Sequence, residues 1–146
     1  GAGDADFIRV VRGAKPNVGS SPVGRQGGTQ LLTLGDNCGY GVTLHELCHA
    51  IGLFHEQSRS DRDNYVCILW DNIEDSPDDM SYNFNKRPHD GIDLGGYDFE
   101  SIMHYFPTAF SKNGKPTLMA KKSGVKFGQQ THLSGGDIAA IRSLYP

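Results

Sequence analysis

The chain has 146 residues, of which 37% are hydrophobic and 21% are charged, a balance typical of one folded domain with a sizeable core and not of a disordered chain. Its net charge is −3, from 14 basic and 17 acidic side chains, which argues against a nucleic-acid partner or a polybasic membrane contact. No run approaches the roughly 18 apolar residues that span a membrane.

The first third of the chain predicts two strands followed by a helix. The segments 6–13 ("DFIRVVRG") and 29–35 ("TQLLTLG") have strand composition, and the Gly, Pro and Ser residues between them predict a loop. From residue 41 to about 53 the apolar side chains recur at the spacing of a buried helix. Gly52 stands where this helix should end, because glycine accepts the left-handed conformation of a C-cap.

The remaining chain is mostly irregular. The short apolar run at 64–70 predicts a strand or a buried extended segment, the run at 116–120 predicts a short strand, and residues 78–84 predict a short helix. Ser134, with Asp137 three residues later, predicts the N-cap of a C-terminal helix. Early strands and a helix, followed by irregular chain and one late helix, predict an α+β fold with two lobes.

Three cysteines, Cys38, Cys48 and Cys67, allow one disulfide and one remaining thiol, in three possible pairings. None of them stands in a CxxC zinc pattern, and the composition alone leaves the pairing open. Cys48 lies between two histidines of the predicted helix, and the helical geometry turns it towards the core.

The segment "HELCHAIGLFHE" holds three of the six histidines of the chain. His45 and His49 are four residues apart, so on a helix they lie about 40° apart around the axis and about 6 Å along it. Two imidazoles so placed can bind one metal ion, and Glu46, next to the first ligand, can act as a general base. The pattern therefore predicts a zinc-peptidase site.

The pattern continues to H-E-x-x-H-x-x-G-x-x-H, in which Gly52 turns the chain and His55 completes a three-histidine set. Three protein ligands leave one position open for water, which is typical of a catalytic zinc site. Bound zinc lowers the pKa of such a water to about 7. The sequence therefore predicts one Zn²⁺ per chain and hydrolysis by zinc-activated water.

Beyond this motif the chain resembles the astacin-type zinc endopeptidases of the metzincin clan. Glu56 follows the third histidine as in that family, and "SIMHY" (residues 101–105) resembles its methionine turn. The stretches "GRQGGTQLLTLGDNCGYG" and "LSGGDIAAIRSLYP" are similar as well, so the resemblance runs from about residue 6 to the end.

The resemblance implies a role for individual residues. The metal ligands would be His45, His49 and His55, with Tyr105 as a further, displaceable ligand whose hydroxyl stabilises the oxyanion. The catalytic residues would be Glu46 and Tyr105. Met103 would form a hydrophobic floor under the metal. Outside this set we interpret His89, His104 and His132 as surface or packing histidines, and Arg59, Asp61, Arg62 and Asp63 as a charged cluster that stabilises the loop after the helix.

The resemblance also implies a two-lobed zincin fold in one catalytic domain, residues 1–146. Residues 1–52 would form an upper lobe with a small twisted, mixed or mostly antiparallel sheet and the active-site helix above the cleft. Residues 53–146 would form an irregular lower lobe with the methionine turn and the C-terminal helix. The strand at 29–35 would be the rim of the cleft, where an extended peptide substrate pairs with its edge.

Family catalytic domains usually carry a further strand and a long helix ahead of the segment that starts at residue 6. We therefore expect the N-terminal part of the catalytic domain to lie outside this chain, as a separate segment or propeptide partner, and we expect the sheet to show a bare apolar face.

Together these features predict a secreted, extracellular zinc metalloendopeptidase that takes protein or peptide substrates, with no nucleic acid and no membrane span. Another metzincin is the first alternative, which Glu56 and Tyr105 disfavour. The second alternative is a catalytically silent protein-binding fragment of a processed metalloprotease.

Overall fold

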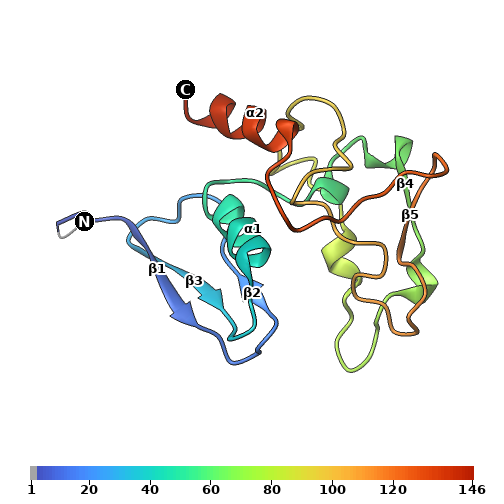
Figure 1. Cartoon of the computed structure of the whole chain (residues 1–146), viewed down its shortest axis with the longest axis horizontal. Coiled ribbons are helices and arrows are strands. Elements are labelled where there is room, and N and C mark those ends of the chain that lie inside the picture. The colour runs from blue at the N-terminus through green and yellow to red at the C-terminus, as the bar shows by residue number, and fades with distance from the viewer. Residues whose placement is uncertain (1–2) are drawn as a thin grey trace. The chain divides into compact units, whose positions relative to one another are not determined.

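The computed structural model describes residues 3–146, which separate into two compact units (Figure 1). The first unit holds the chain up to Phe54 together with Gln130–His132, and the second holds His55–Gln129 and Leu133–Pro146. Two α-helices, a small mixed sheet and a separate antiparallel pair of strands make the fold α+β, as predicted.

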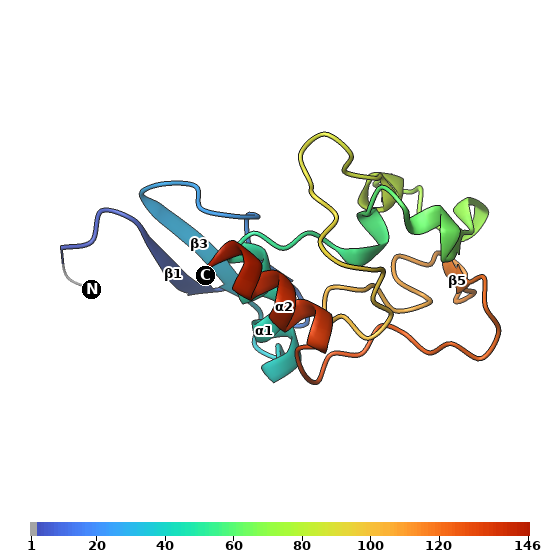
Figure 2. The ribbon, with the colours of Figure 1, turned by 90° about the horizontal axis from the view of Figure 1, so that it is seen from above.

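The sheet of the first unit has the strand order β1-β3-β2. β1 (Phe7–Arg12) runs parallel to β3 (Thr29–Leu34), and the two strands lie side by side in Figure 2. β2 (Gly19–Ser20) pairs antiparallel with the end of β3. The predicted strands at 6–13 and 29–35 are confirmed, whereas β2 was missed because it is two residues long and lies in the Gly- and Ser-rich stretch that predicts a loop.

The prediction that the strand at 29–35 is an edge was wrong. β3 is the middle strand, paired with β1 on one side and with β2 on the other. At Thr33 and Leu34 the backbone of β3 is engaged on both sides, so beside these residues a peptide would have to pair with the outer strand β2.

The two faces of this sheet differ in burial. α1 packs against β3 and β2, and Leu32 beneath it is fully buried. Phe7 and Leu31 share the opposite face, since Phe7 pairs with Thr29, and they expose 40% and 49% of their surface. Val10, which pairs with Leu32 on the α1 side, is 60% exposed, so exposed apolar side chains occur on both faces of the sheet and are not confined to one bare apolar face as expected.

The helix α1 (Tyr40–Ala50) ends where the sequence predicts. Ile51 is its C-cap, and Gly52 follows with φ of 112°, a conformation that strains other residues. At its first turn Gly41 lies directly under the backbone of Gln130, so that any Cβ at position 41 would overlap that carbonyl oxygen. Residues 130–132 therefore cover the start of α1.

The second unit has little regular structure. β4 (Val66–Ile68) pairs antiparallel with β5 (Leu118–Ala120), so the run at 64–70 contains a strand, one of its two predicted alternatives, and the predicted strand at 116–120 is confirmed. The unit also contains four short 3-10 helices: η1 (Glu56–Ser58), η2 (Arg62–Asn64), η3 (Trp70–Asn72) and η4 (Ser81–Phe84). The short helix predicted at 78–84 is η4. Val66, Ile73, Phe84 and Leu118 form a buried hydrophobic cluster in this unit.

The C-terminal helix α2 (Gly135–Leu144) begins with the predicted cap. The Ser134 hydroxyl accepts a hydrogen bond from the amide of Asp137, and the Asp137 carboxylate accepts one from the amide of Ser134, which forms a capping box. The same carboxylate reaches the methionine turn, where it accepts bonds from the Ser101 hydroxyl and the Ile102 amide.

The charged residues that follow α1 have the structural role that the sequence predicts. Arg59 donates two hydrogen bonds to Asp61, of 2.9 and 3.0 Å, and others to the carbonyls of Leu94 and Gly95. Arg62 is buried and donates to the carbonyls of Gln57 and Phe84. These arginines tie irregular segments together in place of sheet or helix hydrogen bonds.

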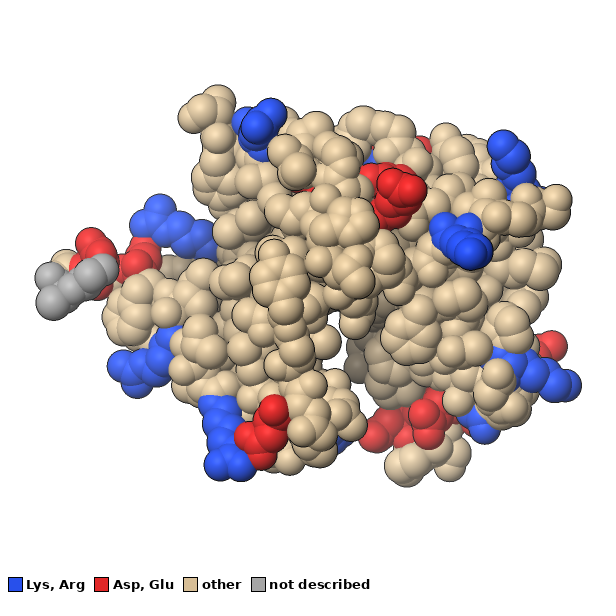
Figure 3. Space-filling view, viewed as in Figure 1, with Lys and Arg blue, Asp and Glu red and all other residues tan. Residues whose placement is uncertain are grey.

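Charges are scattered over the face of the molecule shown in Figure 3, with no large area of one sign. Within residues 3–146, neither α-helix has the length and apolar composition that crossing a membrane requires. Cys48 is 2% exposed and faces the core as predicted, and no disulfide joins the three cysteines of the described chain.

Candidate metal and catalytic site

The helix α1 brings His45 and His49 together on one face. Their ring centroids lie 4.6 Å apart with the ring planes at 90°. Both side chains are buried, at 8% and 7% exposure. The four-residue spacing therefore gives the convergent pair that the sequence predicts.

The environment of His49 keeps it in the form that binds metals. Burial, together with the neighbouring His45, lowers the pKa of His49 to about 4, so the ring is neutral at pH 7. Its Nδ1 lies 2.8 Å from the carbonyl oxygen of Leu53, which can only accept a hydrogen bond. Nδ1 therefore carries the proton, and Nε2 presents its lone pair as a metal ligand.

Glu46 is buried in the first unit and lies close to β2. Its side chain is 6% exposed, and a Cβ added at Gly19 in β2 would lie 2.7 Å from Glu46 Cγ. Burial raises the pKa of Glu46 to about 7, and a hydrogen bond from the backbone of Ser21 offsets part of this effect. Oε2 of Glu46 is buried without a hydrogen-bond partner within residues 3–146. An unpartnered carboxylate oxygen beside two histidines suits a base that receives a proton from water.

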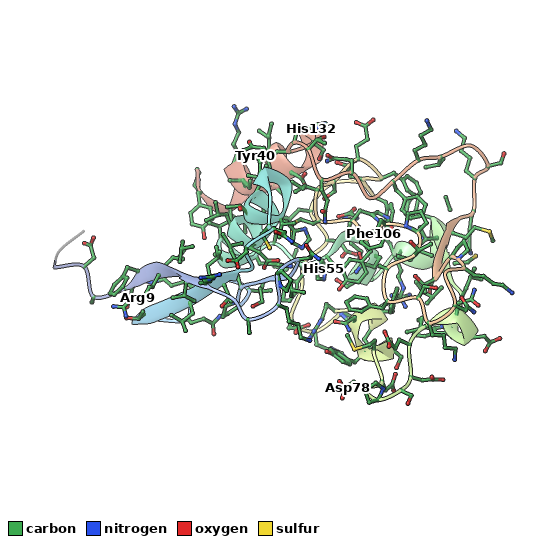
Figure 4. The ribbon with its side chains drawn as sticks, turned by 60° about the horizontal axis from the view of Figure 1, so that its bottom comes forward. Arg9, Tyr40, His55, Asp78, Phe106 and His132 are labelled. Atoms are coloured by element: carbon green, nitrogen blue, oxygen red, sulfur yellow. The ribbon has the colours of Figure 1, made fainter. Side chains whose placement is uncertain are left out.

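His55 and Tyr105 lie next to each other in the second unit. Their ring centroids are 4.3 Å apart, and the Ser58 hydroxyl donates a 2.6 Å hydrogen bond to the carbonyl of His55. His55, which is labelled in Figure 4, is the N-cap residue of η1 and is half-buried. The predicted ligands thus fall into two pairs, His45 with His49 and His55 with Tyr105.

The donor set fits zinc. His45 and His49 of the first unit and His55 of the second supply three imidazole side chains, and none of the three is exposed. Imidazole nitrogens are preferred zinc ligands, and three of them leave a coordination position open for catalysis. The phenol of Tyr105 adds an oxygen donor next to the third histidine.

In the second unit, Met103 makes a backbone contact with Glu56, the residue after His55. Met103 is 1% exposed, and its carbonyl accepts a 3.1 Å hydrogen bond from the amide of Glu56. Burial raises the pKa of Glu56 to about 7, offset by hydrogen bonding from the amide of Asp98 and by the charge of Arg59. Glu56 thus joins the end of the zinc motif to the methionine turn.

The other three histidines are consistent with the predicted surface or packing roles. His89 and His132 are exposed, and His104 is 2% exposed inside an aromatic cluster with Tyr97, Phe99 and Phe127.

The sequence analysis missed two residues that contact Glu46 or Tyr105. Gly19 lies against Glu46, and nothing in the Gly-rich segment around it distinguishes it from its neighbours. Gln57 is fully buried and accepts a hydrogen bond from the amide of Tyr105. Its position two residues after His55 was the only sequence feature that could have indicated a role for Gln57. The residue that it contacts, Tyr105, is 48 residues away in the chain.

Comparison with known proteins finds similar chains among peptidases. The family model for astacin, which describes a family of peptidases, matches residues 2–146. The chain is 49% identical to zinc metalloproteinase nas-13 of Caenorhabditis elegans over 148 residues, covering 99% of this chain and 31% of that protein. It is 45% identical to zinc metalloproteinase nas-15 of the same organism, covering 99% of this chain and 25% of that protein.

Among solved structures, the chain is similar to high choriolytic enzyme 1, a hatching-enzyme zinc protease from the medaka fish Oryzias latipes. The TM-score is 0.87 at 41% identity, covering 97% of this chain and 70% of that one. The chain spans between a quarter and a third of the length of these two nematode relatives.

Proposed function

Because the chain belongs to the astacin family of zinc metallopeptidases, we propose that it is the catalytic part of an endopeptidase that hydrolyses peptide bonds in proteins. The observation that carries this proposal is Glu46, whose buried and unpartnered carboxylate oxygen lies on the same helix as His45 and His49.

His45, His49 and His55 would hold the zinc ion, with Tyr105 as a further ligand in the resting protein. Zinc bound there would supply Lewis-acid polarisation of the scissile carbonyl and a water acidic enough to be deprotonated near neutral pH. The neutral state of His49 supports this assignment, since a protonated imidazole cannot ligate a metal.

Glu46 would move the proton. Its carboxylate takes a proton from the attacking water and delivers it to the nitrogen of the leaving amine. Burial suits both halves of this task, because it raises the basicity of the carboxylate towards neutral pH. The backbone of Ser21 holds the carboxylate in place, so that its free oxygen stays available to the water.

Tyr105 would donate a hydrogen bond from its hydroxyl to the oxyanion that develops on the scissile carbonyl. Such a donor accelerates the reaction because it acts more strongly in the transition state than in the bound substrate. Packing supports its ring, which contacts Phe84 and Phe110 at centroid distances of 5.7 and 5.5 Å. Met103 would line the base of the metal site.

A protein or peptide substrate would bind in an extended conformation along β2, the outer strand that lies against Glu46. The two units would act together as one catalytic domain. We also propose that the protein is secreted, since members of this family are generally secreted or extracellular.

The test is hydrolysis of casein by the purified protein, with and without a chelator and in the variant Glu46→Gln. Chelation and the substitution should each abolish hydrolysis, and zinc should restore only the wild-type protein. Glu100→Gln, an exposed glutamate, is the matched control and should remain active. One bound zinc per chain without chelator-sensitive hydrolysis would overturn the enzyme assignment in favour of a silent binding fragment.

A further inference from the structure

The hydrogen bond between Gln57 and Tyr105 has no role in the function proposed above. The Gln57 side chain is fully buried, and its Oε1 accepts a 3.1 Å hydrogen bond from the backbone amide of Tyr105. No sheet or helix supplies this bond, since residues 101–105 form a turn. A side chain from η1 therefore fixes the backbone of the residue proposed to stabilise the oxyanion.

The orientation of the Gln57 amide is determined by this contact. The amide of Tyr105 is a donor, so only the carbonyl oxygen of Gln57 can face it. The Gln57 Nε2 then points elsewhere, and it is one of two buried side-chain polar atoms without a hydrogen-bond partner in the described part of the chain. A buried donor without a partner reduces stability, so Gln57 is not explained by stability alone.

The carbonyl group of Tyr105 is fixed as well. His104 Nδ1 donates a 2.7 Å hydrogen bond to the Tyr105 carbonyl oxygen, and the Tyr97 hydroxyl lies 2.8 Å from His104 Nε2. The donor and the acceptor of the Tyr105 backbone are thus both held by buried side chains, Gln57 on one side and His104 on the other. Fixing these two groups fixes the direction of the Cα–Cβ bond that carries the phenol.

The same contact couples Tyr105 to His55. Gln57 is two residues after His55, and the neighbouring Glu56 amide binds the carbonyl of Met103. Two hydrogen bonds therefore join η1 to the 103–105 segment, and across them the His55 and Tyr105 rings lie 4.3 Å apart. This contact keeps the phenol at a defined position beside the third histidine.

We propose that Gln57 is a positioning residue for Tyr105, holding the phenol where the hydroxyl can reach the developing oxyanion. The proposal rests on the endopeptidase function proposed above. Gln57 touches neither substrate nor metal in this assignment, and its whole effect on the reaction passes through the backbone of Tyr105.

The first test is a double-mutant cycle on kcat with Gln57→Leu and Tyr105→Phe. Gln57→Leu should lower kcat by roughly tenfold or more, since small misplacements of catalytic groups are costly, and should leave KM nearly unchanged. In the Tyr105→Phe background the same substitution should change kcat less than about twofold, because the hydroxyl it positions is gone. An equal loss in both backgrounds would overturn the proposal.

A matched control separates positioning from a general loss of packing. Thr117 is also fully buried, and its hydroxyl donates a 2.6 Å hydrogen bond to the carbonyl of Ala109 in the same unit. Thr117→Val removes a comparable buried hydrogen bond without touching Tyr105. It should leave kcat unchanged in both backgrounds, and a loss equal to that of Gln57→Leu would overturn the proposal.

The second test needs no activity. Hydrogen exchange at the Tyr105 amide, followed by NMR in the intact protein, should be slow in the wild type and in Gln57→Glu, which keeps an acceptor oxygen, and fast in Gln57→Leu. A Tyr105 amide that exchanges fast in the wild type overturns the positioning role, even if no variant folds. If the protein hydrolyses nothing, the endopeptidase assignment fails, and the exchange rates still decide whether Gln57 holds Tyr105.

Discussion

Asp137 accepts a 2.6 Å hydrogen bond from the hydroxyl of Ser101, which lies 36 residues earlier in the chain. The carboxylate that caps α2 thereby also holds the first residue of the methionine turn. The Asp137 side chain thus makes two kinds of contact. The helix cap is local and can be predicted from the sequence, whereas the contact with Ser101 is long-range and cannot. The stability of the turn therefore depends on the start of the C-terminal helix.

Replacing Asp137 by asparagine should destabilise the protein by about 2–3 kcal/mol, because hydrogen bonds from Ser101 and from two backbone amides would lose their charged acceptor. Urea unfolding at pH 7 measures this change. Asp78→Asn, at an exposed loop position, should alter stability by less than about 0.5 kcal/mol. Equal effects of the two substitutions would show that the buried network adds no stability.

Substituting Gly19 by alanine should lower kcat by at least tenfold while the protein stays folded. The new Cβ would lie 2.7 Å from Glu46 Cγ and 2.8 Å from Val42 Cγ1, so the glutamate side chain must move. The measurement is peptide hydrolysis under saturating substrate. Gly96→Ala, where no atom lies within 4 Å of the new Cβ, is the control and should keep full activity. Unchanged kcat in Gly19→Ala would show that the position of Glu46 tolerates this shift.

Removal of zinc should lower the thermal unfolding midpoint, because the metal binds only the folded site. Free zinc at a thousandfold excess over its dissociation constant stabilises the folded state by about 4 kcal/mol. His49→Ala should lose both the bound zinc, measured by metal analysis, and the shift of the midpoint on adding zinc. His89→Ala, an exposed histidine outside the motif, should keep both. Retention of one zinc by His49→Ala would remove this residue from the ligand set.

The ion pair of Arg59 and Asp61 should make stability depend on pH in the acid range. The hydrogen bond from Arg59 holds the pKa of the Asp61 carboxyl below its usual value. A lowered folded-state pKa contributes stability above the unfolded pKa of about 3.9, and this contribution is lost as the pH falls through the folded value.

Asp61→Asn should therefore cost roughly 1 kcal/mol at pH 7, and the difference from the wild type should shrink below pH ~4. Urea midpoints at both pH values measure it, with the exposed Asp71→Asn as control. A difference that stays constant down to pH ~3 would mean that the carboxylate charge of Asp61 is not the source of the stabilisation.

The sequence predicted the parts of the fold that short-range patterns determine. The helix of the histidine motif, its end at Gly52 and the cap at Ser134 follow from periodicity and from local backbone preferences, and each is present in the structure. β2 could not be predicted, because two residues carry no periodicity, and its pairing with β3 depends on tertiary contacts.

The candidate site also has one part that short-range patterns predict and another that depends on tertiary contacts. His45 and His49 were recognisable because one helix brings them together. The contacts of Glu46 with Gly19 and of Gln57 with Tyr105 join segments 27 and 48 residues apart, and no spacing rule links such positions. The placement of the 29–35 strand at the rim was wrong for a related reason, since strand order is a property of the assembled sheet.

The return of residues 130–132 to the first unit has a practical consequence for dissecting this protein. The backbone passes between the two units after Phe54, after Gln129 and after His132, so no single cut separates them into two intact fragments. A fragment that ends at Phe54 would lack the segment that covers Gly41, and the first turn of α1 would open to solvent. Expression of either unit alone should therefore yield protease-sensitive material, and a split version would need the 130–132 segment grafted back onto the first fragment.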